Sequence, residues 1–240
     1  MIYTQTNNCK KQDHGLSLVF IHGNSMNSDL FLPQLNSNKF ESYNCIAIDL
    51  PGHGKSDRFE EYSISFLTEK VAEEISELEN FVLIGHSLGG QISIHLLSLF
   101  SKRCKAIILI GTAPIDPKFN LSEIYNINKT SLLLLQSELK DDEITSLRNF
   151  LYPIQDNWSK IIQDSICNTD QEFRLGYASS LVASETLDEV KILKQFKGFK
   201  MIVAGESDPL LKQSHLKMVC EKLNIKLELI NHAGHFPNLE

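Results

Sequence analysis

Ser87 is the residue of this sequence best placed to act as a nucleophile, because it stands at the centre of Gly85-His86-Ser87-Leu88-Gly89. This spacing fits G-x-S-x-G, a strand-to-helix turn that exposes a serine hydroxyl at the end of a sheet. A serine in so tight a turn adopts a strained backbone conformation, and bulk two residues before or after it would clash, so both positions favour glycine. His86 is expected to point away from the site and to serve in packing or hydrogen bonding.

The segments on either side of this turn have the composition that it needs. The apolar run at 81–84 precedes the turn and is typical of a buried strand, and residues 90–100 can form a helix after it. The first N–H groups of such a helix point towards the serine and favour negative charge there. Between a strand and a helix, the G-x-S-x-G pattern indicates a nucleophile far more strongly than it does alone.

A serine hydroxyl becomes an effective nucleophile when an imidazole takes its proton and a carboxylate orients that imidazole. We expect His235 to be the base and Asp208 to be the acid, because each follows a predicted strand. His232 and Asp116 also follow predicted strands, so they are the competing candidates for the base and the acid.

Attack on a carbonyl also requires donors for the oxyanion that develops. We expect the backbone N–H of Leu88 to be one donor and the backbone N–H of Asn24 to be the other. Asn24 follows Gly23 in the loop after the apolar run 16–21, where a small residue permits a turn. The side chain of Asn24 would have no part in this role.

Short apolar, β-branched runs recur along the chain and predict strands that are covered on both faces. They occupy 16–21, 44–48, 81–84, 106–110, 200–204 and 226–230. Helix patterns lie between them, and the clearest begins after Ser63, a predicted N-cap, with an apolar stripe of Ile64, Leu67, Val71, Ile75 and Leu78. This alternation predicts the α/β class, with a mostly parallel sheet flanked by helices and a ligand site beyond the carboxyl ends of the strands.

The alternation of strands and helices stops between about 115 and 186, where only helical patterns occur. We therefore predict one domain in two parts, 1–114 and 187–240, with a helical cap at 115–186 inserted between strands. The run of leucines at 132–135 is expected to form the packing surface of this cap, which an acyl chain could also contact. The basic residues of the cap are expected on a solvated face: Lys118, Lys129, Lys140, Arg148, Lys160 and Arg174.

The composition excludes several classes of protein. The net charge is −7 and no Lys/Arg cluster stands out, which argues against a nucleic acid partner. The apolar runs are too short to cross a bilayer and no signal peptide is recognisable, so we expect a cytoplasmic protein without a membrane span. Five scattered cysteines without C-x-x-C spacing predict neither a disulfide framework nor a zinc site. His232 and His235 lack further ligands at metal-binding spacing, so we expect no metal and no cofactor.

Five ordered segments of this chain together resemble the α/β-hydrolase fold superfamily, in its serine esterase and lipase branch. They are Phe20-Ile21-His22-Gly23-Asn24, Asp49-Leu50-Pro51-Gly52-His53-Gly54-Lys55-Ser56, Gly85-His86-Ser87-Leu88-Gly89-Gly90, Gly205-Glu206-Ser207-Asp208-Pro209 and Gly234-His235-Phe236-Pro237-Asn238. The resemblance implies the triad Ser87, Asp208 and His235, in the chain order typical of these enzymes. Only about fifteen residues precede the first central strand, too few for the long antiparallel hairpin of many relatives, so we expect one edge strand to be short or absent.

These observations predict a serine hydrolase that cleaves a small to medium carboxylic ester or thioester through an acyl-enzyme intermediate. Two other functions use the same residues. In one, the triad of a cofactor-free lyase or carbon–carbon bond hydrolase acts mainly as a base. In the other, a hydrolase-fold receptor binds a ligand without turnover.

Overall fold

The computed structural model of this chain describes residues 1–7, 15–182 and 188–240, and it contains one seven-stranded sheet in the order β1-β3-β2-β4-β5-β6-β7. β1 pairs antiparallel with β3, and every other pair of neighbours is parallel. The strands are β1 (Thr4–Thr6), β2 (Ser17–Ile21), β3 (Asn44–Ile48), β4 (Phe81–His86), β5 (Cys104–Ile110), β6 (Phe199–Gly205) and β7 (Lys226–Ile230). The α/β class and all six predicted strands are confirmed, and β1 forms a three-residue antiparallel edge.

Helices connect the parallel strands and cover both faces of the sheet. They are η1 (Ser28–Phe31), α1 (Leu32–Leu35), η2 (Asn38–Phe40), α2 (Ile64–Glu74), α3 (Leu88–Phe100), α4 (Leu121–Ile124), η3 (Ser131–Leu135), α5 (Asp141–Leu151), α6 (Asn157–Asn168), α7 (Gln171–Val182), α8 (Glu189–Gln195) and α9 (Gln213–Leu223). The predicted N-cap of α2 is confirmed, since the Ser63 hydroxyl accepts a 3.1 Å hydrogen bond from the backbone N–H of Phe66.

The alternating side chains of the central strands divide the core into two clusters. In β2, Val19 and Ile21 pack in the cluster that contains α2 and α3, whereas Leu18 and Phe20 pack in the cluster that contains η1 and α1. Period-two alternation places successive side chains on opposite faces of a strand, so a strand buried on both faces is apolar throughout.

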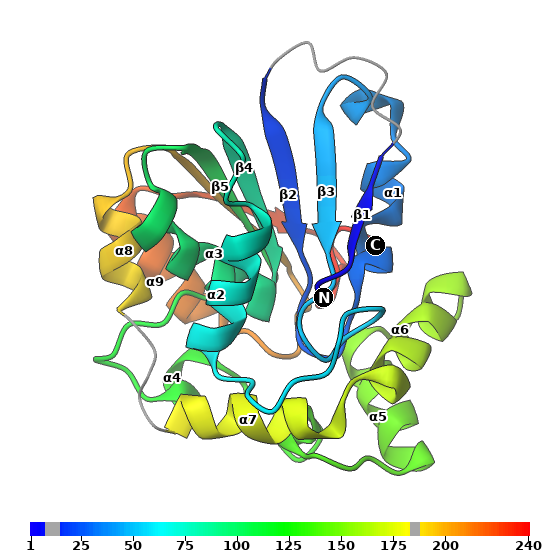
Figure 1. Ribbon diagram of the computed structural model, residues 1–240. Helices are drawn as coiled ribbons and strands as arrows, with labels where there is room; N and C mark the ends of the chain where they lie inside the picture. The colour runs from blue at the N-terminus through cyan, green and yellow to red at the C-terminus, as the bar shows by residue number, and fades with distance from the viewer. Residues whose placement is uncertain (8–14, 183–187) are drawn as a thin grey trace.

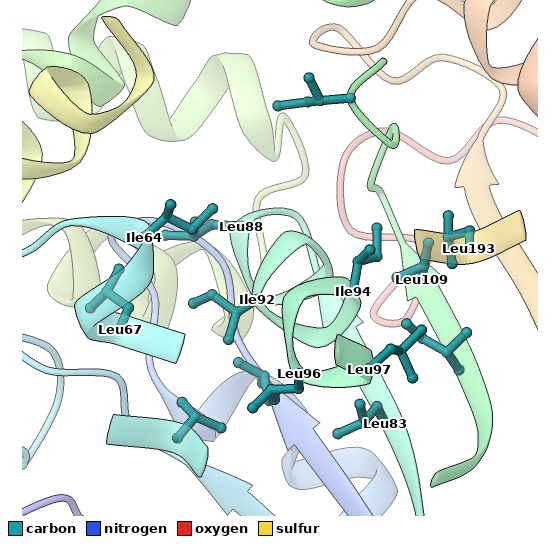
Figure 2. Packing of buried hydrophobic residues seen from close by; sticks show 14 of the residues in the cluster. Ile64, Leu67, Leu83, Leu88, Ile92, Ile94, Leu96, Leu97, Leu109 and Leu193 are labelled. Carbon is teal, nitrogen blue, oxygen red and sulfur yellow. The ribbon is translucent and has the colours of Figure 1, made fainter. Parts of the chain in front are cut away.

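Helix α3 lies at the centre of the larger cluster and is therefore held firmly against the sheet. Figure 2 shows its apolar side chains beside those of α2, β4, β5 and α8, among them Ile92 and Leu96 of α3, Leu67 of α2 and Leu193 of α8. Each such side chain contributes about 1.5–3 kcal/mol through its burial. This packing fixes the position of the turn that begins α3, where Ser87 lies.

Between β5 and β6, the described residues form helices and an isolated bridge between Tyr125 and Leu211, but no strand of the sheet. Figure 1 shows α5, α6 and α7 beyond the arrowheads of the strands, across their carboxyl ends. The division into core and cap at 115–186 stays a prediction, and the boundary at 186 lies outside the described residues, as does Cys9. No helix in the described part of the chain is long and apolar enough to span a membrane.

Candidate active site

Ser87 occupies the sharp turn between β4 and α3, with φ 51° and ψ −119°. A positive φ is strained for any residue with a Cβ, and such strain persists only where the surroundings over-determine the conformation. Two hydrogen bonds hold the turn. The Ser87 N–H donates one of 2.9 Å to the carbonyl of Ile110, and the Ser87 carbonyl accepts one of 3.0 Å from the Thr112 hydroxyl. Firm packing of α3 and these two bonds to β5 and its loop fix the serine.

The two glycines of the turn are required by close backbone approach. A Cβ on Gly85 would lie 2.3 Å from the carbonyl oxygen of Gly89, and a Cβ on Gly89 would lie 2.1 Å from the carbonyl oxygen of Ile21. Real Cβ atoms do not approach backbone oxygens so closely. The steric reason that the sequence suggested for both glycines is therefore confirmed.

Asp208 and His235 lie in the loops after β6 and β7 and form a buried pair. The imidazole Nδ1 of His235 donates 2.9 Å to Oδ2 of Asp208, and the second carboxylate oxygen accepts from the backbone N–H groups of Leu210 and Leu211. Both side chains are almost wholly buried. Because Nδ1 carries the proton in this bond, the Nε2 atom of the neutral ring is an acceptor, which is what a base for Ser87 requires.

The two competing candidates lie elsewhere. His232 is exposed, whereas Asp116 is buried and forms a 3.1 Å ion pair with Lys222 on α9. Burial acts to raise the pKa of Asp116, but the hydrogen bond from the backbone N–H of Lys118 and the contact with Lys222 together hold this pKa below its ordinary value. The pairing with a buried carboxylate therefore favours His235 over His232 and Asp208 over Asp116.

His86 fastens the loop that carries His235. Its Nε2 donates 2.9 Å to the backbone carbonyl of His235, and its ring stacks on Phe236 at 4.7 Å between centroids. The expected hydrogen-bonding role of His86 is thereby confirmed. A second contact, which the sequence did not indicate, also holds this loop. The carboxylate of Glu240 accepts hydrogen bonds from the backbone N–H groups of Gly234 and Phe236.

Asn24 lies in a tight turn after β2 that is closed by a hydrogen bond from the Met26 N–H to the Gly23 carbonyl. Asn24, Ser87 and Leu88 line the same cavity. Among the described residues, no protein acceptor takes a hydrogen bond from the backbone N–H of Asn24 or Leu88. Two donors without protein partners beside a serine hydroxyl have the composition of an oxyanion hole.

Two buried histidines brace this loop in a defined neutral form. The Nδ1 atom of His22 donates a hydrogen bond to the Gly23 carbonyl, and its Nε2 atom accepts one from the Leu50 N–H. In the same way, His53 donates to the Pro51 carbonyl and accepts from the Ser25 N–H. Burial is the largest cause that lowers the pKa of both rings, most strongly that of His53. Neither ring could keep its acceptor role if protonated, so both serve the structure rather than the chemistry.

The cavity beside Ser87 has a volume of about 150 Å³. Its walls come from α3, the loop after β5, α4, η3 and α7, and none of its lining residues is charged. Leu132, Leu134 and Leu135 of η3 contribute to the lining, so the leucine run faces the cavity beside Ser87, and its contact with an acyl chain stays a prediction. One wall of the cavity contains the polar side chain of Gln91. Its carbonyl oxygen accepts a hydrogen bond from the Tyr177 hydroxyl, and its amide nitrogen donates one to the Tyr125 hydroxyl.

The expectation of a solvated face for the cap cations is wrong for two of them. Arg148 and Arg174 are buried, with 7% and 2% of their surface exposed, whereas Lys118, Lys129, Lys140 and Lys160 are exposed. Arg174 donates to Ser25, Ser137 and Ile166. Both arginines lie on the inner faces of α5 and α7, although an arginine without a visible partner in the sequence is usually exposed.

The chain is similar to known proteins over most of its length. The model of the family described as alpha/beta hydrolase fold matches residues 17–240. The chain is 25% identical over 236 residues to a pimeloyl-[acyl-carrier protein] methyl ester esterase of Wigglesworthia glossinidia brevipalpis, covering 93% of this chain and 88% of that protein. It is 27% identical over 247 residues to a protein of the same name from Pseudoalteromonas atlantica, with the same two coverages.

Among solved structures, an N-acyl homoserine lactonase, AidH, complexed with N-butanoyl homoserine, superposes with a TM-score of 0.85. The match covers 98% of this chain and 85% of the lactonase, at 22% sequence identity. At this identity the superposition demonstrates a shared fold.

Proposed function

Since this chain belongs to the alpha/beta hydrolase fold family, we propose that it is a serine hydrolase that cleaves carboxylic esters or thioesters through an acyl-enzyme. The observation that carries the proposal is the meeting of three features at one edge of the sheet. They are the strained serine at the β4–α3 turn, the buried His235–Asp208 pair and the uncharged cavity that opens onto the serine.

In the first half of the proposed reaction, the Ser87 Oγ attacks the carbonyl carbon of the ester while His235 Nε2 accepts the hydroxyl proton. Asp208 holds the ring in the required tautomer and stabilises its protonated form. When the bond to the leaving group breaks, the protonated His235 delivers its proton to the departing alcohol or thiol. The acyl group is then bound to the Ser87 oxygen.

The negative charge of the tetrahedral intermediate would be held by the backbone N–H groups of Asn24 and Leu88. Leu88 begins α3, so its N–H belongs to the positive end of the helix dipole. One donor of this kind is typically worth about 10²–10³ in rate. In the second half, water attacks the acyl-enzyme with His235 again as base, and the acid is released.

The cavity supports an apolar, uncharged acyl group as the preferred part of the substrate. Its lining contains no charged side chain, and a carboxylate placed there would lose its hydration without gaining a cationic partner. The relatives named as methyl ester esterases of a carrier-bound pimeloyl group support ester hydrolysis, with a small alcohol as the leaving group. A cytoplasmic location and the absence of nucleic acid partners stay predictions of the composition.

A fluorophosphonate probe tests the proposal directly, because it reacts with an activated serine and remains attached to it. We expect the wild-type protein to be labelled at Ser87, and we expect Ser87→Ala and His235→Ala to lose labelling. His232→Ala is the matched control, since it removes an exposed imidazole three residues away and should label at the wild-type rate.

Labelling that persists in Ser87→Ala would overturn the assignment of the nucleophile. Equal loss of labelling in His232→Ala and His235→Ala would overturn the assignment of the base. Substrate profiling separates esterase from lyase chemistry, because a lyase or carbon–carbon bond hydrolase should turn over simple aryl esters only feebly.

A further inference from the structure

Arg174 is a buried charge that has no carboxylate partner among the residues that the structure describes. Its guanidinium donates from Nε to the Ser25 hydroxyl at 3.0 Å, from Nη1 to the Ser137 carbonyl at 3.1 Å and from Nη2 to the Ile166 carbonyl at 2.6 Å. All three acceptors are neutral, and no ion pair within residues 1–7, 15–182 and 188–240 includes Arg174. Burial lowers its pKa to about 10, so it keeps its charge at neutral pH.

An isolated buried cation is costly, because its lost hydration is not offset by an opposite charge. Packing alone does not explain it, since an apolar side chain could fill the same space at lower cost. The partners of the guanidinium therefore indicate what it does. Two are backbone carbonyls of the cap, and the third is a hydroxyl in the turn after β2, which lies 149 positions away in the sequence.

Ser25 connects Arg174 to Asn24. Its hydroxyl accepts from Arg174 and donates 2.7 Å to the Asn24 side-chain carbonyl, so the hydroxyl hydrogen has a fixed direction. The Asn24 side-chain amide in turn donates 2.9 Å to the carbonyl of Leu134 in the cap. The Asn24 side chain is thus held at both ends, by the core turn and by the cap.

The turn itself needs this support. Ser25 is wholly buried and has φ 59°, a left-handed conformation that is unfavourable for a serine. Its backbone N–H donates to His53, and its hydroxyl is engaged by Arg174 and Asn24. If the hydroxyl contact were lost, Ser25 could relax towards negative φ. The Asn24–Ser25 peptide would then rotate, and the backbone of Asn24 would shift together with its N–H.

We propose that Arg174 is a positioning residue for the oxyanion hole, acting through the Ser25 hydroxyl to hold the turn that presents the Asn24 backbone N–H to the substrate. The inference rests on the proposed function of Asn24. It makes the cap helix α7 a support of the catalytic groups as well as a wall of the substrate cavity.

The test measures steady-state ester hydrolysis and the affinity of two inhibitors in Arg174→Gln, in Ser25→Ala and in the variant that carries both substitutions. One inhibitor is an alkyl trifluoromethyl ketone, which forms an oxyanion with the serine. The other is the matching alkyl methyl ketone, which reports binding of the unreacted chain. Arg148→Gln is the control, because Arg148 is also buried in the cap but its Nε and Nη1 atoms donate to no group in the described part of the chain.

We expect Arg174→Gln and Ser25→Ala each to lower kcat about 10- to 100-fold, part of the loss that removal of an oxyanion donor causes. KM should change by less than about threefold, since ground-state binding does not use the donor. Affinity for the trifluoromethyl ketone should fall in parallel with kcat, while affinity for the methyl ketone should not. Because both residues act through one contact, the kcat of the double variant should be no lower than that of the less active single variant.

A merely structural role gives a different pattern, with lower thermal stability in Arg174→Gln but unchanged kcat and unchanged affinity for both ketones in the folded fraction. That result overturns the inference, and so does a normal kcat in Ser25→Ala. If Arg174→Gln does not fold, Ser25→Ala carries the test, because it leaves the two cap contacts of Arg174 in place. A wild-type protein that neither hydrolyses esters nor reacts at Ser87 instead refutes the proposed function and the inference with it.

Discussion

The imidazole of His86, the residue before Ser87, donates a 2.9 Å hydrogen bond to the backbone carbonyl of His235. The neighbour of the serine in the sequence is therefore in direct contact with the residue proposed as its base, 149 positions later. The β4–α3 turn and the loop after β7 are joined by this bond, and the stacking of His86 on Phe236 reinforces it.

Replacement of His86 by leucine should therefore misplace the base while leaving the serine and the cavity intact. We expect kcat to fall about 10- to 100-fold, the loss typical of a small misplacement of a catalytic group. The control is His215→Leu, which removes another buried imidazole that donates to a backbone carbonyl, that of Pro114. If both variants keep wild-type kcat, His86 has no part in positioning His235.

Asp208→Asn tests the acid of the proposed triad. An amide can donate to His235 Nδ1 and stabilise the wrong tautomer, so we expect kcat to fall by about 10⁴ with little change in KM. Asp116→Asn is the matched control, because it alters the competing carboxylate, which pairs with Lys222 instead. Comparable losses of kcat in the two variants would contradict the assignment of Asp208.

Gly89→Ala should destabilise the protein strongly, since its Cβ would lie 2.1 Å from the backbone oxygen of Ile21 and neither segment can move freely. We expect a loss of about 3 kcal/mol or more in the free energy of unfolding, measured by urea denaturation. In Gly234→Ala the nearest atom is the flexible carboxylate of Glu240 at 3.3 Å, so the loss should stay below about 1 kcal/mol. Near-wild-type stability of Gly89→Ala would show that the turn does not need this glycine.

Stability should fall below neutral pH because His22, His53 and His86 are buried as neutral rings. Burial is the largest cause that lowers the pKa of each from 6.5. Above about pH 6.5 the three rings are neutral in both the folded and the unfolded chain, and their contribution to the free energy of unfolding is fully present. As the pH drops below 6.5, the unfolded chain takes up protons that the folded protein excludes, so stability is lost.

For each ring that stays neutral in the folded protein, the free energy of unfolding should fall by about 1.4 kcal/mol between pH 7.5 and 5.5. Urea unfolding at a series of pH values measures this slope. His53→Gln, which removes one of the buried neutral rings, should reduce it. Stability that is independent of pH over this range would contradict the neutral form of these rings.

The uncharged cavity predicts discrimination between acyl groups. 4-Nitrophenyl butyrate should be hydrolysed at least about 100-fold more efficiently, as kcat/KM, than 4-nitrophenyl hemisuccinate, whose added carboxylate would be buried without a partner. Leu135→Ala enlarges the cavity and should shift the preferred acyl chain by about two to three carbons. Leu99→Ala, at an exposed position outside the cavity, is the control. Equal rates with butyrate and hemisuccinate esters would refute a neutral acyl site.

The sequence by itself determined the features that depend on local pattern. Continuous apolar runs indicated the six central strands because a strand covered on both faces must be apolar at every position. The spacing of Gly85, Ser87 and Gly89 indicated the strained turn because the clash that a side chain would cause lies within a few residues or on the neighbouring strand. The apolar stripe of α2 and its cap at Ser63 were equally local.

Only the tertiary structure provided the contact that separates two similar candidates for the base. His232 and His235 follow the same strand, and what separates them is the contact of one with Asp208, 27 positions earlier. Arg174 looked like any other cap cation until its helix was folded onto the turn of Ser25, 149 residues away. Such contacts join segments that have no common periodicity, so no local pattern encodes them, and they arise only when the chain folds.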